Sequence, residues 1–571
     1  MERMLKPDRQ TNSRNAAFYG RYLLIIAGLG GLLYGADIGI IAAALLYLGK
    51  TIELTLEQTS LIVAAVLGGS MISSLVAGVL ADWMGRRRMM ILSGLLFIVS
   101  VGIIVFSQGF VSLFTGRLLQ GMAGGVIAVV VPLYLAECLS ANTRGRGTAI
   151  FQFFLTFGIA AAAFVGWFYT RQAETAMSLA AGNAVLIRAA ENHAWRSMFL
   201  AVIYPGALFF AGAFPLSETP RWLARKGKTA EARKALERSV SPAEAEREMA
   251  EMQSLLQPAH EADTAKGALL RRKYILPFVL ACLVLSLNQT TGINSVLSFL
   301  VVILRQAGMT ARHATQGDVF VVLLNCIMTL VAVFLVDRKG RRFLLRIGTG
   351  GVVLSLLAGG FLFLRAERTR VDVKTRIVTA ETGNTVRLPV NETTFGPATS
   401  GRAMALTVVY SYGDGEHVAT VLSDSQNPVL EIEPEAKYAS ASLVIRHAMY
   451  GPVPSEETGW LVAACLGLFI MAYAVGPGVV VWLMLSELMP TRIRSTGMGI
   501  ALLLNQGIST LIAGVFLPVV GNHGYAVMFF AWAACTVLYF ATATWWLPET
   551  KGKSLEEIEL FFDRRPAAET T

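Results

Sequence analysis

Charged residues are scarce in this sequence. Asp, Glu, Lys and Arg together make up 15% of its 571 residues, whereas a typical soluble domain has about 25% charged residues. Apolar residues make up 54% of the chain, and the mean hydropathy is +0.55. A chain with so little charge is not an ordinary soluble domain, so the composition predicts a membrane protein.

Residues that bind metals or carry out redox chemistry are also few. The chain has five cysteines and six histidines, and the cysteines all lie in or at the edge of apolar segments with no C-x-x-C spacing. Such a pattern is not typical of a metal or redox site. No catalytic triad stands out either, so we expect no metal site, no cofactor and no enzymatic activity.

The formal net charge of +10 is not arranged to bind nucleic acid. A nucleic-acid-binding protein carries its basic residues as a patch or stripe. Here short basic clusters separate apolar runs, which is the arrangement of cytoplasmic loops in membrane proteins. We therefore expect a lipid bilayer, and no nucleic acid, as the partner of this chain.

Apolar runs of about 20 residues or more, long enough to cross a bilayer, recur along the chain. The first run is longer than a signal-peptide core and lacks a clear cleavage site, so we interpret it as an uncleaved span. Twelve spans are predicted, near residues 22–48, 58–81, 89–107, 111–136, 147–169, 197–215, 274–304, 317–336, 343–364, 458–485, 496–520 and 524–547.

Loop charge predicts the orientation of these spans. Arginines and lysines cluster after spans 2, 4, 8 and 10, and they are sparser in the alternate connections. Because loops rich in Lys and Arg stay in the cytoplasm, both termini are predicted to be cytoplasmic. We expect a multi-pass protein of the plasma (inner) membrane.

Two long stretches interrupt the spans. Residues 216–272 form a predicted cytoplasmic helical linker, in which Ser241, Pro242 and Glu244 make a capping box at a helix start. Residues 366–456 are predicted to be a small extracytoplasmic β-rich insertion without cysteine. Its alternating, β-branched runs TRIVTAETGNTVRLPV and ALTVVYSYGDGEHVATVLS predict hairpins, and ASASLVIRHAMY predicts a further strand.

The two halves of the chain repeat each other. GVLADWMGRRR follows span 2 and VFLVDRKGRRF follows span 8, and a Glu precedes an Arg by seven residues after both span 4 and span 10. Two such six-helix halves, with the substrate between them near the midplane, are a known transporter plan. The halves are residues 1–215 and 273–547, the second divided by the insertion into 273–365 and 457–547, and residues 548–571 form a cytoplasmic tail.

Charged residues of these repeats predict a gate on the cytoplasmic side. We expect a network between the halves that closes this side in one state and breaks in the other. The alternative is that the arginines only hold loops in the cytoplasm, which leaves the fixed spacing of Asp and Gly unexplained. The predicted gate residues are Asp82, Arg86, Glu137, Arg144, Asp337, Arg341, Glu487 and Arg494.

Asp37 is an acid in the middle of the first apolar run, GGLLYGADIGIIAAALL. A charged side chain at the bilayer centre costs about 2.5–3.5 kcal/mol or more. Such residues face the interior of the helix bundle and mark ion or substrate pathways. The sequence therefore predicts a functional role for Asp37.

Several motifs together resemble the sugar porter family of the major facilitator superfamily. They are GRLLQGMAGG, PLYLAE, ETPRWL, NQTTGIN and PETKGKSLEEIE, and the resemblance covers both halves but not residues 366–456 or the termini. It implies an all-α membrane protein with the twelve-helix major-facilitator fold of two six-helix halves, into which the β domain is inserted. It also implies an alternating-access transporter.

The resemblance implies a sugar site built from amides and aromatic rings. Amides donate and accept hydrogen bonds without a net charge, which suits sugar hydroxyls, and an aromatic face covers the C–H surface of the ring. The alternative is that these amides only join helices. The implied substrate-binding residues are Tyr34, Gln152, Asn288, Gln289, Asn294, Asn325, Trp482 and Gln506.

The resemblance also pairs Asp37 with Arg117 in span 4 and implies proton coupling. Porters that couple to protons resemble this chain in having Asp at this position, whereas passive facilitators have Asn. A buried carboxylate stays ionised while a guanidinium contacts it, and desolvation favours its protonation when the pair separates. The alternative is a static structural ion pair.

Departures from the family pattern leave the substrate open. Asn288 stands in place of a glutamine, Ser298 and Phe299 replace a tyrosine pair, and Gln506 replaces a tryptophan. The more polar site argues against glucose and leaves pentoses, polyols, inositols and sugar acids as candidates. We expect a monomeric, proton-coupled symporter that imports a monosaccharide or polyol. The alternatives are a passive facilitator of the same fold and a non-transporting sugar sensor.

Overall fold

The structure is a computed structural model. It describes residues 6–139, 141–239, 245–250, 252, 272–382, 384–396, 403–424, 428–434, 441–489, 494–551 and 562. The predicted start of the linker helix, at Ser241, lies outside the described residues.

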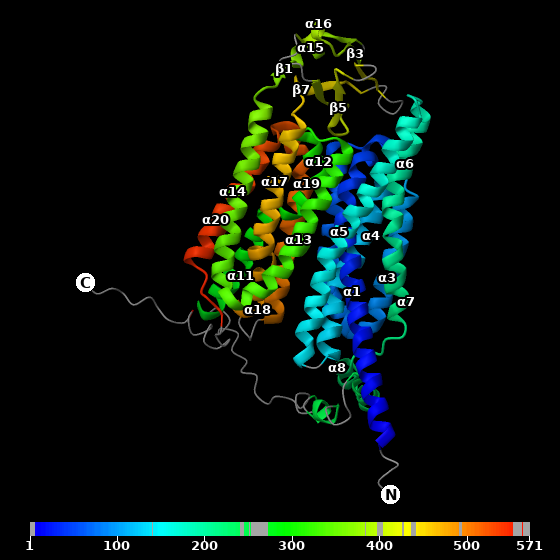
Figure 1. Cartoon of the computed structure of the whole chain (residues 1–571), viewed down its shortest axis with the longest axis vertical. Helices are drawn as coiled ribbons and strands as arrows, with labels where there is room; N and C mark the ends of the chain where they lie inside the picture. Colours follow the sequence, from blue (N-terminus) through cyan, green and yellow to red (C-terminus); the bar gives the residue numbers. More distant parts are fainter. Residues whose placement is uncertain are drawn as a thin grey trace, which may run out of the picture.

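The first half of the chain is a bundle of long helices, drawn from blue to green in Figure 1. Two shorter helices, α8 (Pro220–Arg225) and α9 (Thr229–Glu237), follow it. The bundle helices are α1 (Lys6–Thr51), α2 (Leu56–Met84), α3 (Arg86–Val105), α4 (Phe110–Cys138), α5 (Ala141–Leu179), α6 (Ala184–Ala201) and α7 (Ile203–Ala213).

The second half is a similar bundle beside the first (Figure 1). A π-helical turn, Ala474–Gly478, joins two of its helices. Its helices are α11 (Arg272–Thr290), α12 (Ile293–Gln306), α13 (Ala311–Lys339), α14 (Arg341–Glu367), α17 (Glu456–Tyr473), α18 (Val479–Leu488), α19 (Arg494–His523) and α20 (Tyr525–Trp545).

The predicted twelve membrane spans are confirmed. Within the described residues, twelve helical stretches are long and apolar enough to cross a membrane. The sixth begins earlier than predicted, because it runs from Ala184 rather than from residue 197. Its first turns carry polar residues that lower the hydropathy, which is why the sequence placed the start later. In the structure these residues bond to the end of α1. Lys50 pairs with Glu191 at 2.9 Å, and the Trp195 indole N–H donates to Thr51 at 2.8 Å.

Glycine allows α1 and α5 to approach closely. A Cβ atom on Gly35 would lie 1.9 Å from the carbonyl oxygen of Leu155, so no larger residue fits there. Small residues at helix contacts are typical of membrane bundles, where no hydrophobic force drives helices together. This contact holds the part of α1 that carries Tyr34 and Asp37 against its neighbour.

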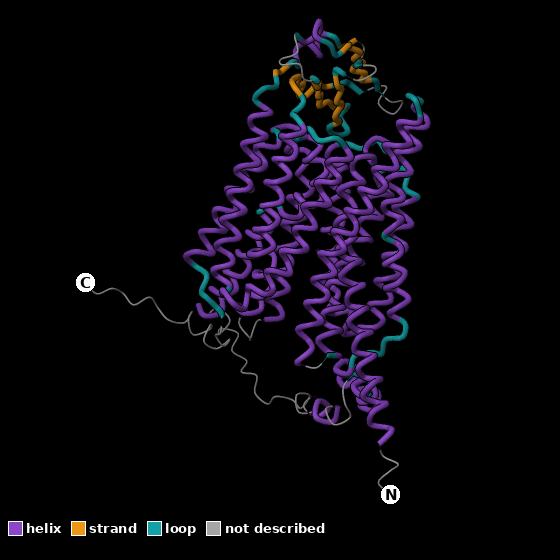
Figure 2. Tube along the Cα trace, viewed as in Figure 1, coloured by secondary structure: helices purple, strands orange, loops and turns teal. Residues whose placement is uncertain are grey.

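The predicted β domain is present between α14 and α17, at one end of the helix bundles (Figure 2). It has two antiparallel sheets, with strand orders β1-β7-β4-β5 and β2-β3-β6, around an apolar core of its own. The strands are β1 (Val371–Asp372), β2 (Glu381–Thr382), β3 (Thr385–Pro389), β4 (Met404–Ser411), β5 (His417–Leu422), β6 (Val429–Ile432) and β7 (Val444–Pro452).

The hairpin prediction was right for β4–β5 and partly wrong for the first run. Residues Lys374–Thr379 form a helix, α15, rather than a strand, and a second short helix, α16, spans Glu392–Phe395. In α15 only Ile377 is fully buried, as one helical face requires, whereas a strand would bury alternate residues. Strand β6 was not predicted, because its four residues give too short a pattern.

The two bundles contact each other near the end that carries the β domain, which we call the β-domain end. The Leu517 N–H in α19 donates to Ser60 Oγ in α2 at 3.0 Å, and the Arg312 N–H in α13 donates to Glu174 Oε1 in α5 at 3.2 Å. Toward the opposite end, where α1 begins and α20 ends, the ribbons of the two halves diverge in Figure 1.

Candidate functional site

A cluster of amides, of which Gln289 and Asn505 are buried, lies between α11, α12 and α19. The Gln289 amide N–H donates to Asn505 Oδ1 at 3.1 Å, and the Asn294 amide donates to Gln289 Oε1 at 2.9 Å and to Ser509 Oγ at 2.7 Å. Gln289 and Asn294 were predicted, whereas Asn505 and Ser509 were not assigned to the site. Their spacing of four residues, one helical turn, is the signal that could have found them.

Gln289 and Asn294 lie on either side of a break between two helices, α11 and α12. Helix α11 ends at Thr290 and α12 begins at Ile293, with Gly292 between them at φ +82°. A Cβ on Gly292 would lie 2.4 Å from the Trp532 ring, so both the backbone angle and the space require glycine. Broken helices of this kind line substrate sites in transporters.

Asn288 points to a second irregular element. Its amide N–H donates to the Tyr473 hydroxyl at 3.1 Å, and Tyr473 directly precedes the π-helical turn. The other amide atom, Oδ1, is buried and has no hydrogen-bond partner within the described structure. An acceptor of this kind can receive a hydroxyl group.

The remaining predicted residues come from both halves. Tyr34 in α1 lies beside Gln506 in α19. Gln152 in α5 is one turn before Thr156, whose hydroxyl lies 3.8 Å from Cys326, the residue after Asn325 in α13. The contact between α5 and α13 therefore brings Gln152 and Asn325 to the same level of the bundle.

Trp482 differs from the other members of the predicted set. It follows the π-helical turn in α18, and 43% of its surface is exposed. Among the described residues it makes no hydrogen bond or ring contact with the amides. Its packing against a sugar stays a prediction.

Asp37 and Arg117 form the predicted ion pair in the membrane region. The Asp37 Oδ1 and Arg117 Nη1 atoms are 3.1 Å apart, and the residues are 0% and 1% exposed. The same guanidinium donates to Gln120 Oε1 at 2.7 Å, and it lies over the Phe199 ring. The second carboxylate oxygen, Oδ2, is buried without a hydrogen-bond partner in the described structure.

The ion pair adjoins the amide site. A Cβ on Gly124 in α4 would lie 3.0 Å from the Tyr34 ring and 3.5 Å from Asp37 Oδ2. Both side chains therefore lie against one small patch of α4, and Tyr34 in turn lies beside Gln506.

Asp318 is a buried acid that the sequence reasoning missed. It lies in α13 two turns from Asn325, it is 2% exposed, and no partner for its carboxylate is present among the described residues. The signal was an Asp inside an apolar run, as for Asp37, but no motif drew attention to it.

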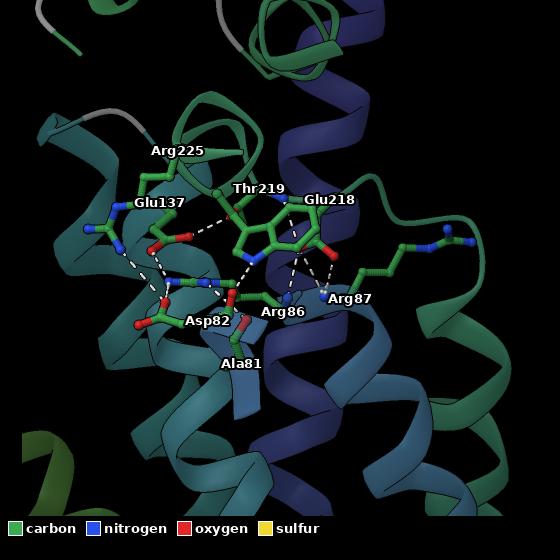
Figure 3. A network of polar contacts seen from close by, with 9 residues as sticks. Ala81, Asp82, Arg86, Arg87, Glu137, Glu218, Thr219 and Arg225 are labelled. Carbon is green, nitrogen blue, oxygen red and sulfur yellow. Dashed lines mark hydrogen bonds and ion pairs between the residues drawn. The ribbon is translucent and has the colours of Figure 1, made fainter. Parts of the chain in front are cut away.

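Figure 3 shows the polar network at the end of the first half opposite the β domain. Glu137 accepts from Arg86 at 3.0 Å and from the Thr219 hydroxyl at 2.5 Å. Asp82 pairs with Arg86 at 2.7 Å and with Arg225 at 3.7 Å. All these contacts lie within one half of the protein or between it and α8.

Glu218 caps α3 in this network. Its carboxylate accepts the backbone N–H groups of Arg86 and Arg87 at 2.8 and 3.2 Å. The N-cap residue, Gly85, has no side chain that could accept these bonds. Burial raises the pKa of Glu218, against the lowering effect of these hydrogen bonds. The sequence reasoning used the ETPRWL segment only as a motif and missed this contact.

The second half repeats the arrangement. Glu487 accepts from Arg341 at 3.1 Å and from the Thr550 hydroxyl at 2.6 Å. Glu549 accepts the backbone N–H groups of Arg341 and Arg342 at 3.0 and 3.1 Å. The Glu-Thr pairs of ETPRWL and PETKGK thus make the same contacts in the two halves. The glutamate caps a helix, and the threonine donates to a buried or half-buried glutamate.

The predicted closure between the halves is not tested by these contacts. The side chains of Arg144, Asp337 and Arg494 lie outside the described residues. The described ion pairs of Arg86 and Arg341 each stay within one half. A gate that joins the halves stays a prediction.

Comparison with known families accounts for most of the chain. Residues 23–381 and 438–562 match the family described as "Sugar (and other) transporter". Apart from the two ends of the chain, the unmatched residues are 382–437, which lie inside the β domain. The β domain therefore contains the stretch in which this chain departs from the family.

Similar proteins align over nearly the whole chain. The glucose transporter GlcP of Staphylococcus epidermidis is 28% identical, over 96% of this chain and 99% of that protein. The human proton myo-inositol cotransporter is 27% identical, over 99% of this chain and 85% of that protein. The solved inward-open structure of the xylose transporter XylE from E. coli has a TM-score of 0.65 at 20% identity, covering 94% of this chain and 98% of that one.

These matches and the twelve-helix fold lead to one conclusion. The chain belongs to the sugar transporter family of the major facilitator superfamily, and it is a multi-pass membrane transporter, not an enzyme.

Proposed function

We propose that this protein is a proton-coupled symporter that imports a monosaccharide or a polyol. The observation that carries the proposal is the buried Asp37–Arg117 pair, which lies against the same patch of α4 as Tyr34, and Tyr34 lies beside the amide of Gln506. A passive sugar facilitator does not need an acid at this depth, where it is costly. The name of the human relative, a proton cotransporter, agrees with coupling.

The amide cluster suits a polyhydroxylated, uncharged substrate. Gln289 bonds to both Asn294 and Asn505, and each amide offers both donors and acceptors. A sugar hydroxyl can replace one of these bonds without leaving a buried polar group unpaired. The names of the relatives span glucose and myo-inositol, so we keep monosaccharides and polyols as the substrate class.

Coupling follows from the environment of Asp37. The carboxylate is stabilised in its charged form while the Arg117 guanidinium contacts it. Movement of α1 relative to α4 during the transport cycle separates the pair, and the buried carboxyl group then takes a proton. Substrate binding at Tyr34, three residues away on α1, biases this movement.

We propose that both termini and the networks around Glu137 and Glu487 face the cytoplasm. Basic loops stay on that side, and the start of α1 and the end of α20 lie at the end of the bundle that carries these loops (Figure 1). The β domain, at the other end, is then extracytoplasmic. Arg144, Asp337 and Arg494 remain candidates to join the halves when the cytoplasmic side closes. We also propose that the protein is a monomer.

Thermal unfolding of the purified protein against a panel of hexoses, pentoses, polyols and inositols tests the substrate class. A bound ligand stabilises the folded state in proportion to RT ln(1 + [L]/Kd). We expect a rise in Tm with at least one member of the panel. That member should also exchange, labelled for unlabelled, across vesicles that contain the protein.

Two outcomes contradict the proposal. Stabilisation by none of these compounds at high concentration would exclude the proposed substrate class. Binding without any exchange in vesicles would favour the sensor alternative over a transporter.

A further inference from the structure

The turn between β4 and β5 contacts the other half of the protein. The α2 backbone N–H of Leu56 donates to the carbonyl oxygen of Glu416 at 2.7 Å. The backbone N–H of Glu416 donates to Glu57 Oε2 at 3.0 Å. Glu416 thus binds the first turn of α2 through both of its backbone groups.

The same residue is also bonded to the second half. The Asn522 amide in α19 donates to Glu416 Oε2 at 2.6 Å, and it also donates to the carbonyl oxygen of Pro518 in its own helix at 3.0 Å. Glu416 therefore links α2, in the first half, to α19, in the second half.

The turn fits closely against α2. Gly415 has φ +146°, and a Cβ atom there would lie 2.9 Å from Glu57 Oε2 and 3.0 Å from the Thr55 Cβ. Gly413, two residues earlier, has φ +96° but no atom within 4 Å of its Cβ position. Both glycines thus have a left-handed backbone, but only Gly415 lies in close contact with α2.

The contact lies where the halves must separate. Next to it, Ser60 in α2 bonds the α19 backbone at Leu517, and Ala64 packs against Gly514. The β domain is joined covalently to the second half through α14 and α17. For α2 to move away from α19, its bonds to Glu416 must break.

We propose that the β4–β5 turn, residues 412–416, is a latch that holds the β-domain end of the transporter closed. The latch binds α2 when the two halves meet at this end, and it releases α2 when they part. Its effect is to slow the opening of the substrate site toward the β-domain side. The inference rests on the proposed function in one respect: it requires that the two halves move apart and together during transport.

Labelling of a buried thiol measures this opening without any substrate. Ala64→Cys, in a background with the five native cysteines replaced by alanine, places a thiol between α2 and α19. A membrane-impermeant maleimide added from the β-domain side reacts when this end opens. Gly415→Ala should raise the labelling rate roughly 5–30-fold, as expected for the loss of hydrogen bonds that hold two states together.

Gly413→Ala is the matched control. It introduces the same methyl group at a left-handed position of the same turn, but it meets nothing in α2. It should leave the labelling rate close to that of the parent. Equal rates in the parent and in Gly415→Ala, or equal increases in both glycine variants, would overturn the latch.

A cross-link tests whether the turn releases α2. A Cβ on Gly415 would lie 3.0 Å from the Thr55 Cβ, so a small outward shift of the turn brings Thr55→Cys and Gly415→Cys to the Cβ spacing of a disulfide, about 3.5–4.5 Å. Mass spectrometry can follow the position-64 peptide separately. Oxidation should suppress labelling at position 64, and reduction should restore it. Unchanged labelling in the oxidised protein would show that the turn travels with α2, which contradicts a latch.

This readout is independent of the proposed substrate and coupling. A latch effect in a protein that transports none of the tested sugars would contradict the proposed function and leave the latch in place. Sugar transport without any effect of Gly415→Ala on labelling would contradict the latch and leave the proposed function in place.

Discussion

Gln289 holds a central place among the polar residues of this protein. It donates to Asn505 and accepts from Asn294, so it connects α11, α12 and α19 through two side-chain hydrogen bonds. Motif resemblance singled out Gln289 and Asn294. It could not give their partner Asn505, because that residue is 216 positions away in the chain and the pairing depends on how α19 packs.

Gln289→Ala should weaken sugar binding. A substrate hydroxyl that loses its partner in a buried site costs about 1–3 kcal/mol, which is roughly a tenfold loss of affinity or more. Gln108→Ala, an exposed amide in the turn before α4, serves as the control and should bind sugar normally. Affinity that is equal in both variants would place the sugar elsewhere.

At the scale of helices, the carboxylates of Glu218 and Glu549 begin α3 and α14. Each accepts the first two backbone N–H groups of its helix, next to a glycine with positive φ, Gly85 or Gly340. The first backbone N–H groups of a helix have no partner within the helix. In both halves a glutamate from a distant loop accepts them, in place of a local N-cap side chain.

Glu549→Ala should destabilise the second half. The loss of a helix cap costs about 0.5–2 kcal/mol, and Thr550 would also hold Glu487 less firmly. We expect a lower Tm of the purified protein, with Glu237→Ala on the exposed face of α9 as the control. A Tm that Glu549→Ala leaves unchanged would show that the cap does not contribute to stability.

Elements differ in how far the sequence predicts them. The twelve spans follow from hydropathy, since a backbone in lipid must satisfy its own hydrogen bonds as a helix. Hairpin β4–β5 follows from its alternation and Gly-containing turn. The helix α15 and strand β6 do not, because short elements depend on the core they pack against. The same holds for Glu218, whose capping role appears only once the loop is folded.

At the scale of the whole molecule, the β domain is an addition to a transporter that is otherwise typical of its family. It has its own apolar core, and the unmatched residues 382–437 lie inside it. Within the described residues its contacts with α2 and α19 lie at the end of the bundle, away from the amides.

Replacement of residues 370–452 by a short Gly/Ser linker should leave sugar binding largely intact. Surface insertions of this kind tolerate removal, and the amide cluster draws its members from α11, α12 and α19. Binding isotherms of the intact and shortened proteins check this. Loss of sugar binding in a shortened protein that remains folded would mean that the β domain completes the substrate site.

The central claim is that Asp37 carries the coupled proton. Asp37→Asn keeps the shape of the side chain and a hydrogen-bonding group, but it cannot release a proton. Sugar exchange, which needs no net proton movement, should therefore survive, whereas accumulation driven by a pH gradient should vanish. Asp318→Asn makes the same change at the other buried acid, two turns from Asn325 in α13, and should leave both activities in place.

The decisive measurement pairs two assays in the same vesicles, uptake driven by a pH gradient and equilibrium exchange of labelled sugar, for the parent, Asp37→Asn and Asp318→Asn. We predict that only Asp37→Asn loses accumulation while it keeps exchange. Parent uptake that ignores the pH gradient would contradict coupling and favour a passive facilitator. Accumulation that persists in Asp37→Asn, or that fails in Asp318→Asn instead, would make the Asp37–Arg117 pair structural and assign the proton to another group.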